Sequence, residues 1–116
     1  MEIHENTRII DLQSEFNLKM PFLKIEFYKS SHKAGEGSEQ EMIVDPYTKI
    51  KDASSSDSLG ELVINPEMTV ENFEGLLEER FGLNAQVFRK SQGVWLQTTA
   101  TDQWTLSKQN ESGQRV

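Results

Sequence analysis

LVINPEMTVENFEGLLEERFGLNAQVFRKSQGVWLQTT, residues 62–99, decides the fold, because its pattern predicts a strand, a helix and a hairpin in succession. The helix is the clearest of these elements. Thr69 is a suitable N-cap, since its hydroxyl can accept a hydrogen bond from the first turn. Gly82 can adopt the left-handed conformation that ends a helix. Between them, apolar residues recur at helical spacing and predict one buried stripe: Val70, Phe73, Leu76, Leu77 and Phe81.

The remaining helix positions carry an acidic run, and we interpret it as a solvated face and not as a metal cluster. Its members are Glu71, Glu74, Glu78 and Glu79. Nothing on such a face is expected to shift the pKa of a carboxyl group.

Strands are predicted on both sides of this helix. Residues 62–64 are short and β-branched and stop at Asn65-Pro66. Residues 85–90 and 94–99 flank residues 91–93, which we interpret as a three-residue hairpin loop containing glycine. A loop of this length pairs Lys90 with Val94, so Phe88, Val94 and Leu96 are predicted to share one face of the hairpin. The opposite face then carries Ala85, Val87, Arg89 and Trp95, and a four-residue loop would exchange Val87 with Phe88.

Two further elements are predicted before this stretch. Asn6 or Thr7 can cap a first helix that carries Ile9, Leu12, Gln13 and Phe16 and stops before Met20-Pro21. Residues 22–29 alternate as a half-buried strand does, with Leu23, Ile25 and Phe27 inward and Lys24, Glu26 and Tyr28 outward. The predicted core comprises Leu23, Ile25, Phe27, Ile64, Phe73, Leu76, Leu77, Phe81 and Leu96.

The segment 30–58 is rich in serine, glycine and charge, so we expect it to be mobile. Residues 42–44 predict a brief strand within it. His32 and Glu36 are too few for a zinc site and are interpreted as part of a turn. After Thr99, Thr101 or Asp102 can cap one helical turn with Trp104 and Leu106, and residues 108–116 are expected to be a frayed tail.

Composition limits the class of protein. A chain of 116 residues with 35% hydrophobic content predicts a single domain over 1–116, with a core from 20 to 106. The sequence has no apolar run of membrane-spanning length, no signal peptide pattern and no cysteine, so a cytoplasmic setting is expected. A formal charge of −7 argues against nucleic-acid and anionic membrane surfaces as partners.

No motif for a nucleotide, a metal or a catalytic triad is present, so we expect no cofactor and no metal. Catalysis is not expected, although a small enzyme or enzyme subunit with a site built from residues 30–58 stays open as the alternative.

The candidate site residues are Tyr28, Arg89 and Trp95, which are predicted to share the second face of the sheet. Read functionally, they bind a protein partner or a second copy of the chain, because Trp, Tyr and Arg dominate binding hot spots. Read structurally, the first helix and the Trp104 turn cover this face and bury Trp95. The structural reading is favoured, since those elements otherwise lack an apolar surface to cover.

The order of the predicted elements resembles the β-grasp, or ubiquitin-like, fold, and residues 62–72 resemble its second strand and helix entry. The resemblance implies an α+β domain with a mixed β-β-α-β-β sheet, here with an added N-terminal helix and a short C-terminal helical turn. A terminal Gly-Gly is absent, which argues against conjugation and sulfur-carrier roles. Residues 21–28, 81–83 with 87–89, and 94–99 with 101–104 are also similar to a small family of uncharacterised bacterial proteins, which implies a bacterial cytosolic setting and no known activity.

Overall fold

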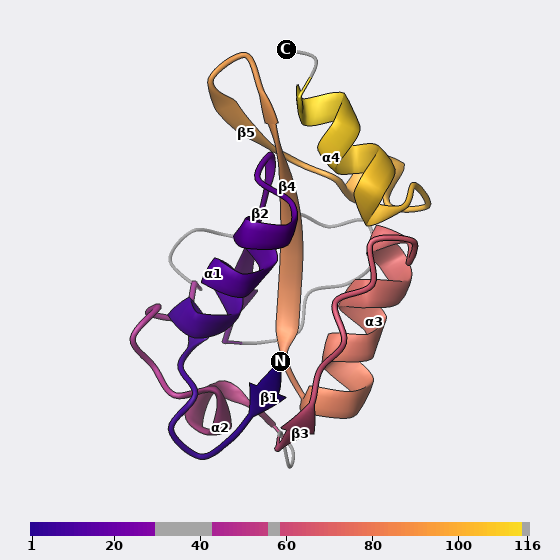
Figure 1. Ribbon diagram of the computed structural model, residues 1–116. Coiled ribbons are helices and arrows are strands. Elements are labelled where there is room, and N and C mark those ends of the chain that lie inside the picture. The colour runs from indigo at the N-terminus through magenta and orange to yellow at the C-terminus, as the bar shows by residue number, and fades with distance from the viewer. Residues whose placement is uncertain (30–42, 56–58, 115–116) are drawn as a thin grey trace.

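The structure is a computed structural model that describes residues 1–29, 43–55 and 59–114 (Figure 1). Over these residues the chain has an α+β fold, as predicted. Its strands are β1 (Glu2–Ile3), β2 (Leu23–Tyr28), β3 (Gly60–Glu61), β4 (Asn84–Ser91) and β5 (Val94–Gln97). Its helices are α1 (Ile9–Lys19), α2 (Ile50–Ala53), α3 (Val70–Phe81) and α4 (Leu106–Gln114), with a 3₁₀ helix at Thr99–Thr101.

The strands form two sheets. In the larger sheet β4 lies between β2 and β5, and in the smaller sheet β1 pairs with β3. The sequence predicts one mixed sheet, whereas every strand pair in the described residues is antiparallel. The strand expected at 62–64 is displaced to Gly60–Glu61, because the N-terminal residues pair there and the Leu62 N–H donates to the Met1 carbonyl at 2.8 Å.

The ends of α3 agree with the prediction. Thr69 Oγ1 accepts a hydrogen bond from the Asn72 N–H at 3.1 Å, and Gly82 closes the helix with a φ of 63°. Helix α1 stops at Lys19, as the following Met20-Pro21 requires. Its N-cap is Arg8 and not Asn6 or Thr7, because the Thr7 hydroxyl already accepts the His4 N–H at 2.9 Å.

The helices begin in pairs, joined head to head by backbone hydrogen bonds. The Ile9 N–H donates to the Thr48 carbonyl at 2.9 Å, and the Ile50 N–H donates to the Thr7 carbonyl at 2.8 Å. The same reciprocal arrangement joins α3 to α4: Val70 donates to Trp104 at 3.0 Å, and Leu106 donates to Met68 at 2.9 Å. These bonds satisfy N–H groups that a helix start otherwise leaves unpaired, and they fix each helix beside its partner.

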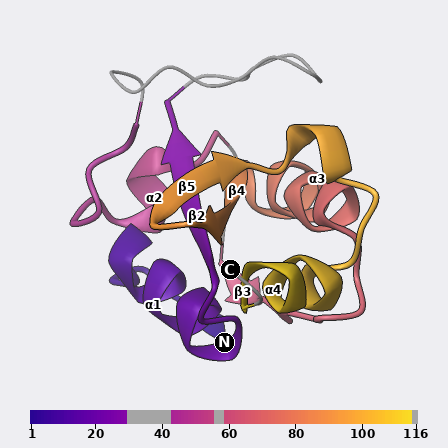
Figure 2. The same ribbon diagram turned by 90° about the horizontal axis from the view of Figure 1, so that it is seen from above.

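Helices α1, α3 and α4 pack on the same side of the larger sheet, which we call the inner face (Figure 2). Phe16 of α1 stacks on Phe73 of α3 with ring centroids 5.6 Å apart. Helix α4 lies so close to β2 that a Cβ added to Gly113 would stand 2.9 Å from the Phe22 Cβ. Where the helices cover it, the inner face is buried and carries Leu23, Ile25, Phe27, Ala85 and Val87.

The predicted core is confirmed except at two leucines. Leu76 is only half-buried, and Leu96 is 42% exposed because the inner face has no cover at that end of β5. The N-terminal part of the chain also belongs to the core, contrary to the predicted limits 20–106, through Ile3, Ile9, Leu12 and Phe16.

The predicted frayed tail is wrong as far as Gln114, because α4 is a nine-residue helix anchored by a buried side chain. The Gln109 amide donates to the Thr101 carbonyl at 2.8 Å and accepts a hydrogen bond from Arg89 at 2.9 Å. A buried amide with both ends satisfied holds the helix against the sheet.

Part of the segment expected to be mobile is ordered. Ile43 bridges to Tyr28, Val44 and Ile50 are buried, and residues 50–53 form α2. The interpretation of His32 and Glu36, and the Met42 end of the brief strand, lie outside the described residues. None of the described helices combines the length and the apolar character that a membrane crossing requires.

Candidate functional site

The register of the β4–β5 hairpin determines which side chains share a face. Ser91 pairs with Val94, Lys90 with Trp95 and Phe88 with Gln97, so the loop is the two-residue pair Gln92-Gly93. Their φ values of 49° and 84° are the positive angles that a type I′ turn needs. The predicted three-residue loop is therefore wrong, and so is the four-residue alternative.

This register places Trp95 and Phe88 on the same face, opposite to the inner face. We call it the outer face, and its described members on the three strands include Lys24, Glu26, Tyr28, Phe88, Lys90, Trp95 and Gln97. Tyr28 and Trp95 lie on this face, as predicted, although Tyr28 is only 3% exposed. Arg89 does not, because it pairs with Leu23 and Leu96 on the inner side.

The outer face carries an open groove of about 460 Å³. It is lined by Lys24, Glu26, Tyr28, Ile43, Phe88, Trp95 and Gln97. Trp95 is 37% exposed, so the structural reading that buried it beneath the first helix is wrong. Helix α1 covers the inner face instead, since its start is bonded to the α2 turn on that side.

A cation lies over both aromatic rings of the groove. The Lys24 ammonium is 5.1 Å from the Phe88 centroid and 5.3 Å from the Trp95 centroid. Such contacts hold a lysine side chain against aromatic surface while leaving its charge available. Burial raises the pKa of the neighbouring Glu26 carboxyl, and the positive charge of Lys24 partly opposes that shift.

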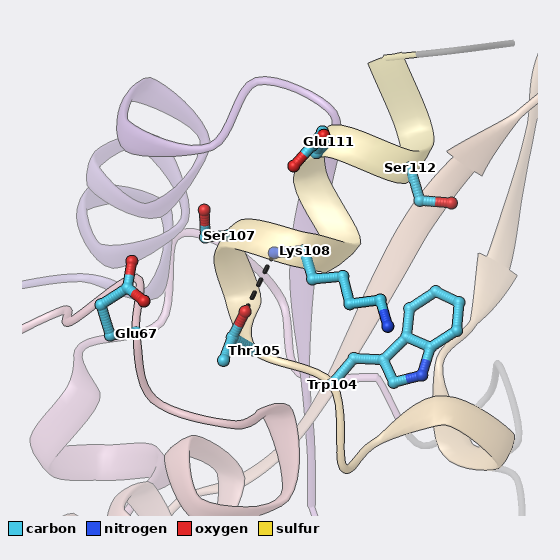
Figure 3. A pocket seen from close by; sticks show the side chains of 7 residues that line it. All are labelled: Glu67, Trp104, Thr105, Ser107, Lys108, Glu111 and Ser112. Atoms are coloured by element: carbon cyan, nitrogen blue, oxygen red, sulfur yellow. Dashed lines mark hydrogen bonds between the residues drawn. The ribbon is translucent and has the colours of Figure 1, made fainter.

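Arg89 belongs to a different aromatic cluster, beside α4. Its guanidinium lies 5.6 Å from the Trp104 ring, and the Lys108 ammonium lies 4.3 Å from the same ring. Figure 3 shows Lys108 extended along the indole, with Glu67 and Glu111 away from it. Trp104, Lys108, Glu67 and Glu111 line a hollow of about 480 Å³ together with Thr105, Ser107 and Ser112. Its charged side chains, Glu67, Lys108 and Glu111, are exposed and of both signs, and none of the described residues that line it is a buried polar group.

The described residues bring together no catalytic set. No three histidine or carboxylate side chains in ranges 1–29, 43–55 and 59–114 are close enough to hold a metal ion. His4 is exposed and its Nδ1 accepts the Asn6 N–H at 3.1 Å, which is a local turn contact. The alternative enzyme site at 30–58 falls mostly on residues that the structure does not describe.

One helix carboxylate departs from the predicted solvated face. Glu74 Oε2 accepts the Val87 N–H at 2.8 Å. Val87 lies on β4 just beyond Phe88, the last β4 residue that pairs with β5. Burial raises the pKa of Glu74 to about 7, with smaller contributions from Asp102 and Glu71 and an opposing one from the Val87 bond. The Glu74 carboxylate thus accepts a hydrogen bond from β4 where β5 supplies no partner strand. Glu74 does not line the groove.

The sequence left Val87 and Phe88 open as the neighbour of Trp95, and it placed Lys24 outward beside Tyr28 without naming it as a site residue. The Gln92-Gly93 pair is the signal that decides for Phe88, since a two-residue turn puts Phe88 on the face of Trp95. Searches against protein-family models, curated proteins and solved structures found no match to this chain.

Proposed function

We propose that the protein is a non-catalytic binding module that recognises another protein through the outer face of the β2–β4–β5 sheet. The observation that carries this proposal is the exposed Trp95, next to Phe88 and beneath the Lys24 ammonium. Aromatic side chains provide large contact area at little entropic cost, and exposed aromatic clusters of this kind mark interaction sites.

The proposal includes the broader setting predicted from the sequence. We infer a β-grasp type of arrangement, which is supported by the succession of α3 and the antiparallel β4–β5 hairpin, with α3 on one face of the sheet. A kinship with small bacterial proteins and a cytoplasmic location are parts of the same proposal, the latter supported by the absence of cysteine.

The test is site-specific photo-crosslinking in extracts of the source cell. A benzophenone amino acid is placed at Gln97 in the groove and, as a control, at Leu18, which is 77% exposed on α1. We expect a discrete protein adduct from position 97 that is absent from position 18 and disappears when Trp95→Ala is added. Tyr47→Ala, at a side chain that is 67% exposed away from the groove, is the matched control and should keep the adduct. No adduct, or the same adducts from both positions, would refute the proposal.

A further inference from the structure

Among the residues that the structure describes, strand β5 forms one edge of the larger sheet, because it pairs with β4 on one side only (Figure 1). The Thr98 N–H still bonds to the Val87 carbonyl on β4. Since backbone groups alternate in direction along a strand, the N–H and C=O groups of Trp95 and Gln97 point away from β4. No hydrogen bond from another described residue reaches these groups. They form a short template for a further strand.

The edge lacks the features that usually protect such strands. Val94, Trp95, Leu96 and Gln97 include no charged residue and no proline, and all four are exposed. Edge strands in proteins that avoid strand addition are commonly marked by lysine, proline or a bulge. The composition of β5 therefore suits pairing with a partner strand.

The two sides of β5 differ in chemistry. Towards the inner face it presents Val94, 56% exposed, and Leu96, 42% exposed. Towards the outer face it presents Trp95, flanked by the lysines Lys24 and Lys90. Within the described residues neither lysine has a carboxylate within ion-pair distance. Glu26 lines the same groove and interacts with the charge of Lys24, its neighbour on β2, whereas Lys90 stands on β4 directly beside β5.

We propose that an extended segment of a partner protein, with acidic and apolar residues in alternation, adds to the free edge of β5. Its acidic side chains would lie beside Lys24 and Lys90, and its apolar side chains would continue the Val94–Leu96 side. Strand addition supplies backbone hydrogen bonds for affinity and alternate side chains for specificity. A second copy of this chain that pairs through its own β5 is a poorer occupant, because β5 has no acidic residue to lie beside Lys24 and Lys90. This inference rests on the proposed function.

The test uses two fluorescein-labelled octapeptides, one of alternating valine and glutamate and one of alternating valine and lysine, in fluorescence anisotropy titrations. We expect the glutamate peptide to bind about tenfold more tightly than the lysine peptide, and to weaken as salt is added. Equal affinities, tighter binding of the lysine peptide, or no binding of the glutamate peptide at millimolar protein would overturn the proposal.

A backbone variant separates strand addition from side-chain contact. Gln97→Pro removes an N–H that points to the free edge and leaves the β4–β5 bonds in place, whereas Gln97→Thr keeps the N–H. We expect Gln97→Pro to lower affinity for the glutamate peptide about tenfold and Gln97→Thr to leave it nearly unchanged. Circular dichroism melting of both variants checks the fold, and equal peptide affinities for two folded variants would refute strand addition.

The outcomes keep this inference distinct from the proposed function. A partner that is crosslinked through position 97 and is also retained by the immobilised Gln97→Pro protein in a pull-down would keep the binding module and remove only the strand-addition mode. A dimer in size-exclusion chromatography that Gln97→Pro converts to monomer would assign the edge to a second copy and overturn the acidic segment as occupant.

Discussion

The two faces of the β2–β4–β5 sheet differ in what covers them, although their side chains alternate along the same strands. Phe27, on the inner face of β2, is 1% exposed beneath helices, while Trp95 on the outer face is 37% exposed. The helices cover one face because the head-to-head bonds hold α1 beside α2 and α3 beside α4. Both faces thus carry aromatic side chains, and which of them are buried follows from where the helices are attached.

The largest expected effect comes from a matched pair of phenylalanines on these faces. Phe27→Ala should lower the free energy of unfolding by about 3–5 kcal/mol, because it leaves a cavity in a packed core. Phe88→Ala, at a half-buried ring in the groove, should cost about 1 kcal/mol, since water replaces the lost contact. Chemical denaturation measures both values. Equal losses would show that the outer face is as closely covered as the inner one.

The second largest effect on the free energy of unfolding is expected at Glu74, which bonds to β4 beyond the end of its pairing with β5. Its pKa is raised from 4.5 to about 7 by burial, so the folded state binds its proton more tightly than the unfolded state does. This favours the folded state fully below about pH 4.5, and the stabilisation is lost as pH rises towards about 7.

Glu74→Gln should therefore stabilise the protein at about pH 8 by roughly 2–3 kcal/mol and leave stability at about pH 4 nearly unchanged. The amide oxygen can still accept the Val87 N–H. Urea denaturation across this pH range measures the difference, with Glu78→Gln on the exposed side of α3 as the control. A variant no more stable than wild type at about pH 8 would contradict the buried position of the carboxylate.

A smaller effect on stability is expected at Trp95. Trp95→Ala should lower the free energy of unfolding by only about 1–2 kcal/mol, because the ring is 37% exposed on an open face and water replaces the lost contacts. Tyr47→Ala is the matched control for removal of an exposed aromatic ring. A loss of about 3 kcal/mol or more would place Trp95 in the core and restore the structural reading of this face.

Much of the fold is predictable where neighbours along the chain decide it. The Thr69 cap, the apolar stripe to Phe81 and the Gly82 stop depend on contacts within one helix, and they are confirmed except at Leu76, which is only half-buried. The inward alternation of Leu23, Ile25 and Phe27 in β2 is confirmed for the same reason. The hairpin loop was predicted one residue too long, because glutamine rarely adopts a positive φ and Gln92 does.

The candidate site was predicted only in part. Tyr28 and Trp95 share the outer face, but Arg89 lies on the other side. Phe88 was predicted on this face only as the alternative to Val87. One residue of difference in a loop moves a whole strand's side chains to the opposite face. The site therefore depends on a turn type that the sequence pattern leaves open.

The amino-acid sequence by itself determined the elements whose periodicity is local, namely α3, β2 and the end of α1, because the backbone geometry of helices and strands sets those periods. Only the tertiary structure decided the pairing of β1 with β3, the head-to-head joining of the helices and the face that stays open. Each of these depends on hydrogen bonds between residues far apart in the chain, such as Ile9 with Thr48 and Val70 with Trp104. The periodic pattern of one segment carries no information about which distant segment will pack or pair with it.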